Sequence, residues 1–373
     1  MSDQTRPSST NNGGALAGLR VLDTASLYAG PYLSTMLADH GADVVKIEPP
    51  GGDDYRHFST KLWAACGRGK RSVVLDLRSD SGCDTLRRLA GEFDVMVFNL
   101  PPATLLKRGL DYDTLHALNP DLIVVQVSGY GLDGPFADRP GNGTLGEAFS
   151  GLTYMIGETD GPPVLPSFPL GDAITAYAGA LGVLAALYHR LAGGGGGQLI
   201  DVNGVDAMLQ VVGPVIHEYT GAGEPPVRLG SRLPGAMLRN VFRTSDGEWL
   251  AISASTPRHR NDLATLCGHE AWDDGNPVGD IEPAVRAWIA SQTWSEVDRE
   301  MVSRRLPMAK VNNAADLRTN PHLVARGVIA TVESPEQGPI ATPVPAPRLL
   351  GTPTTLASRM ADLGEHTAEV LGA

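Results

Sequence analysis

Short apolar runs recur through the first half of the chain, and segments with helical spacing, such as 32–39 and 84–91, lie between them. The runs are rich in β-branched residues. Runs of this kind that alternate with helices predict β-α-β units and a parallel sheet covered by helices on both faces. The runs are 19–23, 44–47, 73–77, 95–98, 122–127 and 199–202.

The pattern changes after the last of these runs. Proline and glycine gather over 221–234, which indicates a linker. Asp246-Gly247 then stands between two apolar runs and predicts a β-hairpin. Helical spacing follows over 281–291 and 295–304. We expect a smaller α+β domain over 225–315 and, near the end of the chain, a short helix that ends at Leu371.

Composition narrows the class of protein. The chain has 373 residues and a formal net charge of −12, which argues against a nucleic-acid-binding protein with its usual basic surface. Cys66, Cys83 and Cys267 are odd in number and have no paired spacing. They indicate reduced thiols in a cytoplasmic protein.

Two segments bear on targeting and membranes. Residues 1–14 are polar and lack the apolar core of a signal peptide, so we expect a disordered tail. Residues 173–187 carry no charge, but this apolar stretch is shorter than the ~20 residues that a membrane span needs. It predicts a buried core helix and no membrane partner.

The spacing of residues in the sequence argues against several kinds of site. The first apolar run leads into Thr24 to Pro31, where a lone Gly30 does not make the glycine pattern of a dinucleotide site. Glycines fill 193–197, but no Lys-Ser/Thr follows, and a helix-to-strand turn explains them better than a phosphate loop. Neither metal-ligand spacing nor a Gly-x-Ser-x-Gly elbow occurs, so we expect no metal.

Cations gather in the stretch 56–71, which contains no acid. They are Arg56, Lys61, Arg68, Lys70 and Arg71. One interpretation is a solvated basic loop. The other is a phosphate site, because Arg and Lys together neutralise multiply charged groups and loops at sheet ends bind ligands in open α/β folds. Lys107 and Arg108, after the fourth run, are candidates to extend such a site.

Asp172 is the most informative residue, because it is the only charged residue between Asp160 and His189 and opens the apolar segment. It predicts a helix N-cap, worth about 1 kcal/mol. A helix N-terminus also favours an ionised carboxylate, and such a group beside a reactive acyl compound acts as a nucleophile. Cap and catalyst are compatible roles.

These residues are part of a wider resemblance. The chain resembles the family III CoA-transferases, which include formyl-CoA transferase, carnitine CoA-transferase and the α-methylacyl-CoA racemases. The resemblance covers nearly the whole chain, and its central feature is Gly171-Asp172 at a fixed spacing before Arg190 and Gln198. The matching segments are 16–23, 29–31, 37–49, 68–73, 128–131, 171–172, 184–190, 197–202, 321–327 and 363–367.

The resemblance implies an α/β fold. It consists of a Rossmann-like large domain with a parallel sheet plus a smaller α+β domain, in an interlocked homodimer. The large, CoA-binding domain would combine 15–220 with 316–373, around the small domain at 225–315. The activity would be transfer of CoA from an acyl-CoA to a small carboxylic acid through an aspartyl anhydride and an aspartyl-CoA thioester. Coenzyme A is then a substrate, and no permanently bound cofactor is expected.

The resemblance also assigns site residues. Asp172 is the catalytic nucleophile, Asn99 and Lys107 match CoA-contacting positions, and Arg68, Lys70 and Arg71 approach the nucleotide. From the resemblance we also expect Tyr28, Asn142 and Glu147 at the substrate site.

Two departures from the family pattern matter. Asn142 stands where the racemases have a catalytic His, and Asn does not exchange protons as an acid or base. Glu147 replaces the usual Gln and adds a carboxylate near the site. Transfer is therefore favoured over a racemase. An inactive acyl-CoA-binding homologue stays an open alternative, because it predicts CoA binding without turnover and only an assay separates it from an active transferase.

Overall fold

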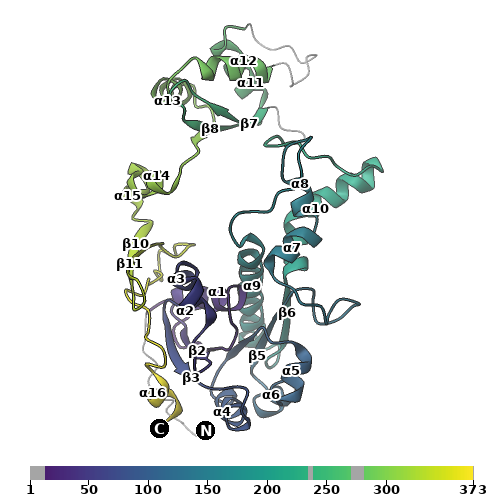
Figure 1. The fold of residues 1–373 in the computed structure, drawn as a ribbon, viewed down its shortest axis with the longest axis vertical. Coiled ribbons are helices and arrows are strands. Elements are labelled where there is room, and N and C mark those ends of the chain that lie inside the picture. The colour runs from purple at the N-terminus through teal and green to yellow at the C-terminus, as the bar shows by residue number, and fades with distance from the viewer. Residues whose placement is uncertain (1–12, 234–237, 270–280, 373) are drawn as a thin grey trace. The chain divides into compact units, whose positions relative to one another are not determined.

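The β-branched runs of the first half form a parallel sheet in the computed structural model, which describes residues 13–233, 238–269 and 281–372. Two compact units divide the chain. The first comprises residues 1–153, 165–224 and 327–373, and the second comprises 154–164 and 225–326. The first unit carries the sheet, and its strand order is β3-β2-β1-β4-β5-β6 (Figure 1). The strands are β1 (Arg20–Asp23), β2 (Asp43–Glu48), β3 (Lys70–Val74), β4 (Val95–Phe98), β5 (Ile123–Ser128) and β6 (Leu199–Asn203).

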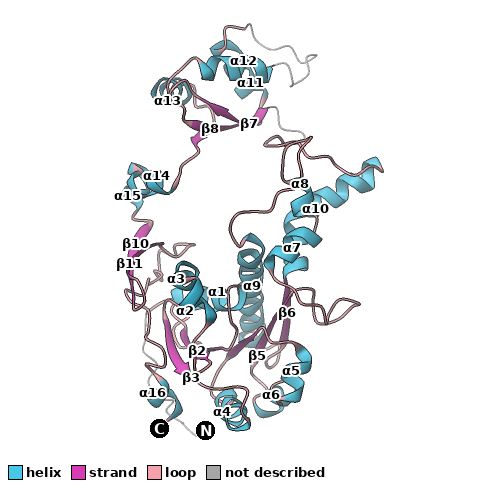
Figure 2. Ribbon diagram, viewed as in Figure 1, coloured by secondary structure: helices cyan, strands magenta, loops and turns pink. Residues whose placement is uncertain are grey.

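Helices lie on both sides of this sheet, as Figure 2 shows. The helices of the first unit are α1 (Ala29–Asp39), α2 (Asp54–Phe58), α3 (Thr60–Cys66), α4 (Asp80–Ala90), α5 (Pro102–Lys107), α6 (Tyr112–Leu118), α7 (Gly143–Phe149), α9 (Leu170–Leu191), α10 (Gly204–Ala222) and α16 (Thr367–Leu371). The prediction of a parallel sheet is confirmed. The third strand begins and ends three residues earlier than predicted, because Asp76 already belongs to the turn before α4.

Alternation along the strands divides the core into two layers. Val95 and Val97 of β4 pack with α1 and α9, whereas Met96 and Phe98 pack with α4, α5 and α6. α9 approaches α1 closely at Gly179, where a Cβ atom would lie 2.3 Å from Leu33 Cδ1. A bare glycine is therefore needed at this helix crossing.

α9 is longer than the uncharged stretch that predicted it. It has 22 residues, with Asp172 in its first turn and Arg190 in its last. By length and composition alone this one helix of the described residues could cross a membrane. In the first unit its Val183 and Ala186 are buried against the sheet layer, as expected of a core helix, while Tyr188 on another face is exposed.

The end of the chain returns to the first unit. β10 (Ile329–Ser334) and β11 (Gly338–Pro343) form a hairpin, and buried Val332 of β10 packs with Trp63 of α3. The backbone N–H of His366 donates to Ser72 O of β3, at 2.9 Å. The predicted short terminal helix is present as α16.

The second unit is built around an antiparallel sheet of three strands, and its first hairpin turns at Asp246-Gly247, as predicted. Its elements are β7 (Leu238–Arg243), β8 (Trp249–Ala254), β9 (Met308–Lys310), α11 (Pro257–Leu266), α12 (Ile281–Ala290), α13 (Trp294–Ser303), α14 (Ala314–Thr319) and α15 (Pro321–Arg326). The short α8 (Leu152–Met155) lies where the chain passes between the units.

The second unit extends beyond the expected 225–315. Residues 154–164 join it because Arg228 donates to Tyr154 O at 3.0 Å and to Gly161 O at 2.9 Å. At the other end the unit continues to Arg326, since Asp316 of α14 pairs with Lys310 of β9 at 3.3 Å. These contacts join segments far apart in sequence. Of the predicted linker, 221–234, the first two residues belong to α10 and residues 223–233 form no helix or strand. Pro234 and most of the predicted tail lie outside the described residues.

Candidate active site

A cavity of about 490 Å³ lies in the first unit where β1, β4 and β5 end. The strand order reverses between β1 and β4, and open α/β sheets bind ligands at such a point, beyond the carboxyl ends of the strands. Loop residues that follow these strands line the cavity together with Asp172 and Thr175 of α9. The sheet topology thus brings the predicted nucleophile to the expected edge.

Asp172 is not the cap of its own helix, which corrects the prediction from sequence. α9 already begins at Leu170, and Pro169 occupies the cap position without a side-chain hydrogen bond. Asp172 Oδ1 instead accepts a hydrogen bond from the backbone N–H of Gly143, the first residue of α7, at 3.0 Å. The carboxylate is therefore held between the beginnings of two helices.

The surroundings of Asp172 raise its pKa above the ordinary value of 3.8. Burial is the main cause, and the nearby charge of Glu147 adds to it, while the Gly143 N–H acts in the opposite direction. Water would stabilise the ionised form better than this site does. Burial thus outweighs the effect of the helix terminus, which was expected to keep Asp172 readily ionised. Because the ionised carboxylate is poorly solvated here, it is a more reactive nucleophile.

Glu147 and two glycines fix the approach of α7 to α9. Glu147 is 2% exposed, and its Oε1 accepts the Gly171 N–H at 2.7 Å. A Cβ at Gly143 would lie 2.5 Å from Asp172 Cγ, and one at Gly171 would lie 2.4 Å from Gly143 O. Glu147 therefore positions the turn that carries Asp172 and is enclosed beside it.

Asn142 and Asn99 line the cavity, but their side chains form hydrogen bonds to the backbone of its walls. Asn142 Oδ1 accepts from Leu145 N at 3.1 Å and caps α7. Asn99 clamps the loop after β1, because its Oδ1 accepts from Ser26 N at 3.0 Å and its Nδ2 donates to Ser26 O at 2.8 Å. Tyr28, on the same loop, also lines the cavity, and burial raises its pKa well above the ordinary value.

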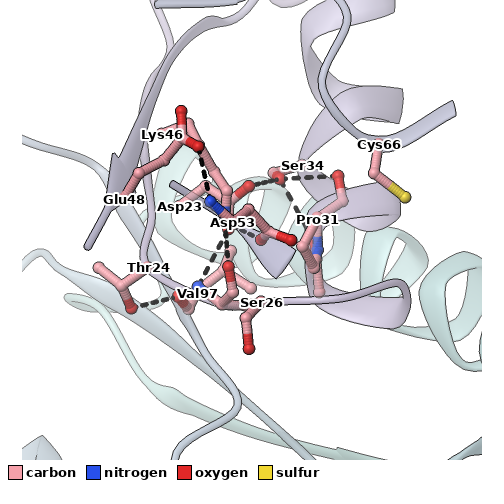
Figure 3. Close-up of polar contacts among 12 residues, drawn as sticks. Asp23, Thr24, Ser26, Pro31, Ser34, Lys46, Glu48, Asp53, Cys66 and Val97 are labelled. Carbon is pink, nitrogen blue, oxygen red and sulfur yellow. Dashed lines mark hydrogen bonds and ion pairs between the residues drawn. The ribbon is translucent and has the colours of Figure 1, made fainter. Parts of the chain in front are cut away.

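A buried charge network lies behind the loop after β1 (Figure 3). Asp23 is 0% exposed and pairs with Lys70 at 2.8 Å and with Lys46 at 3.9 Å. Asp23 Oδ1 also accepts from Ala25 N at 3.1 Å, and Lys46 Nζ donates to Ala25 O. Lys46 pairs further with Asp53 at 3.3 Å. The network therefore fixes the backbone that shapes one wall of the cavity.

The network also sets the charge state of its members. Burial acts to raise the pKa of Asp23, but Lys46 and Lys70 outweigh it and hold that pKa below 3.8. Burial raises the pKa of the nearby Cys66 thiol to about 12, so this group stays a thiol at neutral pH. Thiolate is the nucleophilic form of cysteine, and Cys66 is therefore no rival to Asp172.

The structure does not bring the predicted cations of 68–71 into the cavity. Arg68 pairs with Asp39 at 2.7 Å, and Lys70 is enclosed with Asp23. Arg71 pairs with Asp43 at 2.7 Å and with Glu369. Their role toward the nucleotide stays a prediction, and these ion pairs give it no support.

Lys107 lies in a different place from the nucleophile. It ends α5 and lines a separate open cleft with Arg78, Arg87 and Arg108. Of these, Arg78 pairs with Asp76 at 2.9 Å. The assignment of Lys107 to CoA stays a prediction. Within the described residues, no group of three or more His, Cys, Asp or Glu side chains is arranged to hold a metal.

Two lining residues escaped the sequence analysis. Gly143 supplies the hydrogen bond to the nucleophile, and Arg139 lines the cavity with its guanidinium 3.6 Å from the centre of the Phe136 ring. Arg139 lies in the loop that follows β5 and Gly143 begins the helix after that loop, both at the carboxyl edge of the sheet. That position was the signal available in the sequence.

Comparison with known proteins shows the family of the chain. The model of CoA-transferase family III matches residues 16–367. The succinyl-CoA–D-citramalate CoA-transferase of Chloroflexus aurantiacus is 33% identical, over 95% of this chain and 92% of its own length. The succinate–glutarate CoA-transferase of Agrobacterium fabrum is 32% identical, over 95% and 94%. A CAIB/BAIF family protein from Brucella suis has a similar structure, with a TM-score of 0.85, 29% identity, and coverage of 96% and 99%.

The chain therefore belongs to CoA-transferase family III. It is an enzyme, a CoA-transferase, and an acyl-CoA is its substrate.

Proposed function

We propose that this enzyme moves CoA from an acyl-CoA to a free carboxylic acid, with Asp172 as the nucleophile. The observation that carries the proposal is the placement of Asp172: a desolvated carboxylate on the cavity, held by one backbone N–H. A nucleophile of this kind divides one difficult exchange into easier covalent steps.

The first half of the reaction unloads the donor. Asp172 attacks the thioester carbonyl, the carbon–sulfur bond breaks, and a mixed anhydride and CoA thiolate result. The thiolate then attacks the aspartyl carbonyl, the donor acid leaves as a carboxylate, and an aspartyl-CoA thioester remains.

The second half of the reaction loads the acceptor. The acceptor carboxylate attacks the aspartyl-CoA thioester, the carbon–sulfur bond breaks, and a second anhydride and CoA thiolate result. Thiolate attack on the acceptor's acyl carbonyl then gives the new acyl-CoA and restores Asp172.

The Gly143 N–H contributes to the steps in which the aspartyl carbonyl is attacked. It donates to Asp172 Oδ1 in the resting enzyme. When the aspartyl carbonyl becomes tetrahedral, negative charge gathers on such an oxygen, and a preorganised donor stabilises it at no cost of rearrangement. The site thus supports both attack by Asp172 and attack on it.

Racemisation has less support from the same geometry. A racemase needs a second group that exchanges a proton at the α-carbon, and Asn142 occupies the position in question. Its amide oxygen already caps α7. An inactive binding homologue has less support too, because the relatives that match nearly the whole chain are named as CoA-transferases and Asp172 lies on the cavity.

The acids named for the two relatives are succinate, citramalate and glutarate, all of which carry two carboxyl groups. We propose small carboxylic acids of this kind as substrates.

We also propose a homodimer in the cytoplasm. The free cysteines are consistent with the reducing cytoplasm. A stripe of exposed apolar side chains along one face of α9 supports the dimer. They are Tyr177, Leu181, Leu184, Tyr188 and Leu191. Light scattering after size exclusion tests the dimer.

An exchange assay tests the proposed activity. Purified enzyme is incubated with succinyl-CoA and a panel of unlabelled acids, and the new thioesters are identified by mass spectrometry. Transfer of CoA to at least one acid supports the proposal, provided that Asp172→Asn abolishes it and the exposed control Asp160→Asn does not. Full exchange by Asp172→Asn would refute Asp172 as the nucleophile.

A further inference from the structure

Arg139 is the only cation that lines the cavity of Asp172, among the residues that the structure describes. The other charged side chains on this cavity are Asp138 and Asp172. Arg139 is exposed, and within the described residues its guanidinium has no ion pair or hydrogen bond. The carboxylate of Asp172 and the unpaired guanidinium of Arg139 thus line the same cavity.

The guanidinium of Arg139 is nevertheless held in place. It stacks 3.6 Å from the centre of the Phe136 ring. Phe136 in turn packs edge-to-face against Tyr130 at 5.9 Å and Phe149 at 5.6 Å. Stacking occupies the face of a guanidinium and leaves the N–H groups at its edge free to bind a planar carboxylate with two parallel bonds.

The same short helix connects Arg139 to the nucleophile. α7 begins at Gly143, which donates to Asp172, and ends at Phe149, which supports the stacked ring of Phe136. Seven residues of helix span only about 10 Å. The two ends of one helix thus contact the nucleophile and the ring on which Arg139 stacks.

We propose that Arg139 binds the second carboxylate of a dicarboxylic acyl group and makes the enzyme selective for dicarboxylic acids. This inference rests on the proposed CoA transfer at Asp172. An acyl chain bound with its thioester carbonyl at Asp172 carries its far carboxylate away from that residue. Without a cation, a second negative charge on a cavity with Asp138, Asp172 and nearby Glu147 would be repelled, and Arg139 offsets that repulsion.

Succinate and butyrate separate this role from others, because they have the same chain length and differ in the second carboxylate. The enzyme is compared with Arg139→Gln, which removes the charge, and Arg139→Lys, which keeps it. Arg243→Gln in the second unit is the matched control, because Arg243 also lies over an aromatic ring, that of Trp249, at 5.9 Å. Two readouts are taken: kcat/KM for succinate against butyrate as acceptors, and Kd for succinyl-CoA against butyryl-CoA.

We expect the wild-type enzyme to favour succinate over butyrate in kcat/KM and succinyl-CoA over butyryl-CoA in Kd. Arg139→Gln should reduce each ratio by about ten- to a hundredfold, the usual effect of a charged hydrogen bond. Arg139→Lys should recover part of the loss, and Arg243→Gln should retain the wild-type ratios. Unchanged ratios in Arg139→Gln, or equal weakening of succinyl-CoA, butyryl-CoA and free CoA, would overturn the inference; the second result would assign Arg139 to CoA itself.

The two readouts distinguish failure of the proposed CoA transfer from failure of the proposed role of Arg139. Wild-type enzyme that exchanges CoA with no acid contradicts the proposed function, while the Kd ratios still decide whether Arg139 recognises the second carboxylate. Wild-type enzyme that exchanges CoA with equal kcat/KM for both acids contradicts the role of Arg139 and leaves Asp172 as the nucleophile.

Discussion

The backbone N–H of Gly143 donates to Asp172 Oδ1 across 3.0 Å, so the first residue of α7 holds a carboxylate in the first turn of α9. The contact joins residues 29 positions apart in the chain. It fixes the nucleophile and places beside it the donor that transfer chemistry requires.

This contact makes Gly143 intolerant of any side chain. In Gly143→Ala the new Cβ would lie 2.4 Å from Asp172 N and 2.6 Å from Asp172 Oδ2, so the nucleophile must move. A displacement of about 1 Å costs on the order of a hundredfold in rate, and kcat for CoA exchange should fall by at least that factor. Gly221→Ala is the control, since a Cβ there meets nothing within 4 Å. Normal kcat in Gly143→Ala would refute the placement.

Glu147 should control the pH dependence of transfer. Asp172 must be ionised to attack, so kcat/KM should rise with pH through its raised pKa. Glu147→Gln removes a charge that helps to raise that pKa, while the amide oxygen can still accept the Gly171 N–H. The acid limb should therefore move to lower pH, by less than about one unit. Exposed Glu218→Gln serves as control, and an unmoved or upward-shifted limb contradicts the charge effect.

Asp172 should reduce the stability of the enzyme at neutral pH. Its folded pKa lies above 3.8, so the folded state binds the proton more tightly and ionisation destabilises the fold as pH rises through the folded pKa. Asp172→Asn should thus raise the free energy of unfolding near pH 7, by about 1.4 kcal/mol for each unit of pKa shift. The gain should disappear below pH 3.8. Urea unfolding at several pH values measures it, and a loss of stability at pH 7 contradicts it.

The buried network should have the opposite dependence. Asp23 has a folded pKa below 3.8, so its contribution to stability is present above that value and is lost as pH falls through the folded pKa. Asp23→Asn leaves Lys70 enclosed without its partner and should cost about 3–5 kcal/mol at pH 7. The variant should also lose part of the wild type's acid sensitivity. Asp84→Asn, in an exposed pair with Arg87, should change little.

The sheet followed from the sequence because local signals specify it. Runs such as 95–98 and 122–127 are both β-branched and bounded by turns, and they form β4 and β5 as expected. Asp172 was found because a lone charge before an apolar helix is a local signal as well. Its expected role as N-cap was wrong, because α9 starts two residues earlier and the hydrogen-bond donor comes from α7.

Long-range partners account for the other differences. Arg68 and Lys70 form a basic stretch in the sequence, but their carboxylates, Asp39 and Asp23, come from positions 29 and 47 residues away. Nothing local distinguishes such a cation from one that awaits a phosphate. The stacked Arg139 likewise depends on Phe149, which reaches it only once α7 has packed.

The covalent intermediate on Asp172 can be trapped. Enzyme is mixed with succinyl-CoA, treated with hydroxylamine, and digested for peptide mass mapping. We expect a hydroxamate on Asp172 that appears only when the acyl-CoA is present and that is absent in Asp172→Asn. CoA exchange that proceeds at full rate while Asp172 remains unmodified, or a hydroxamate on a different carboxylate, would contradict it.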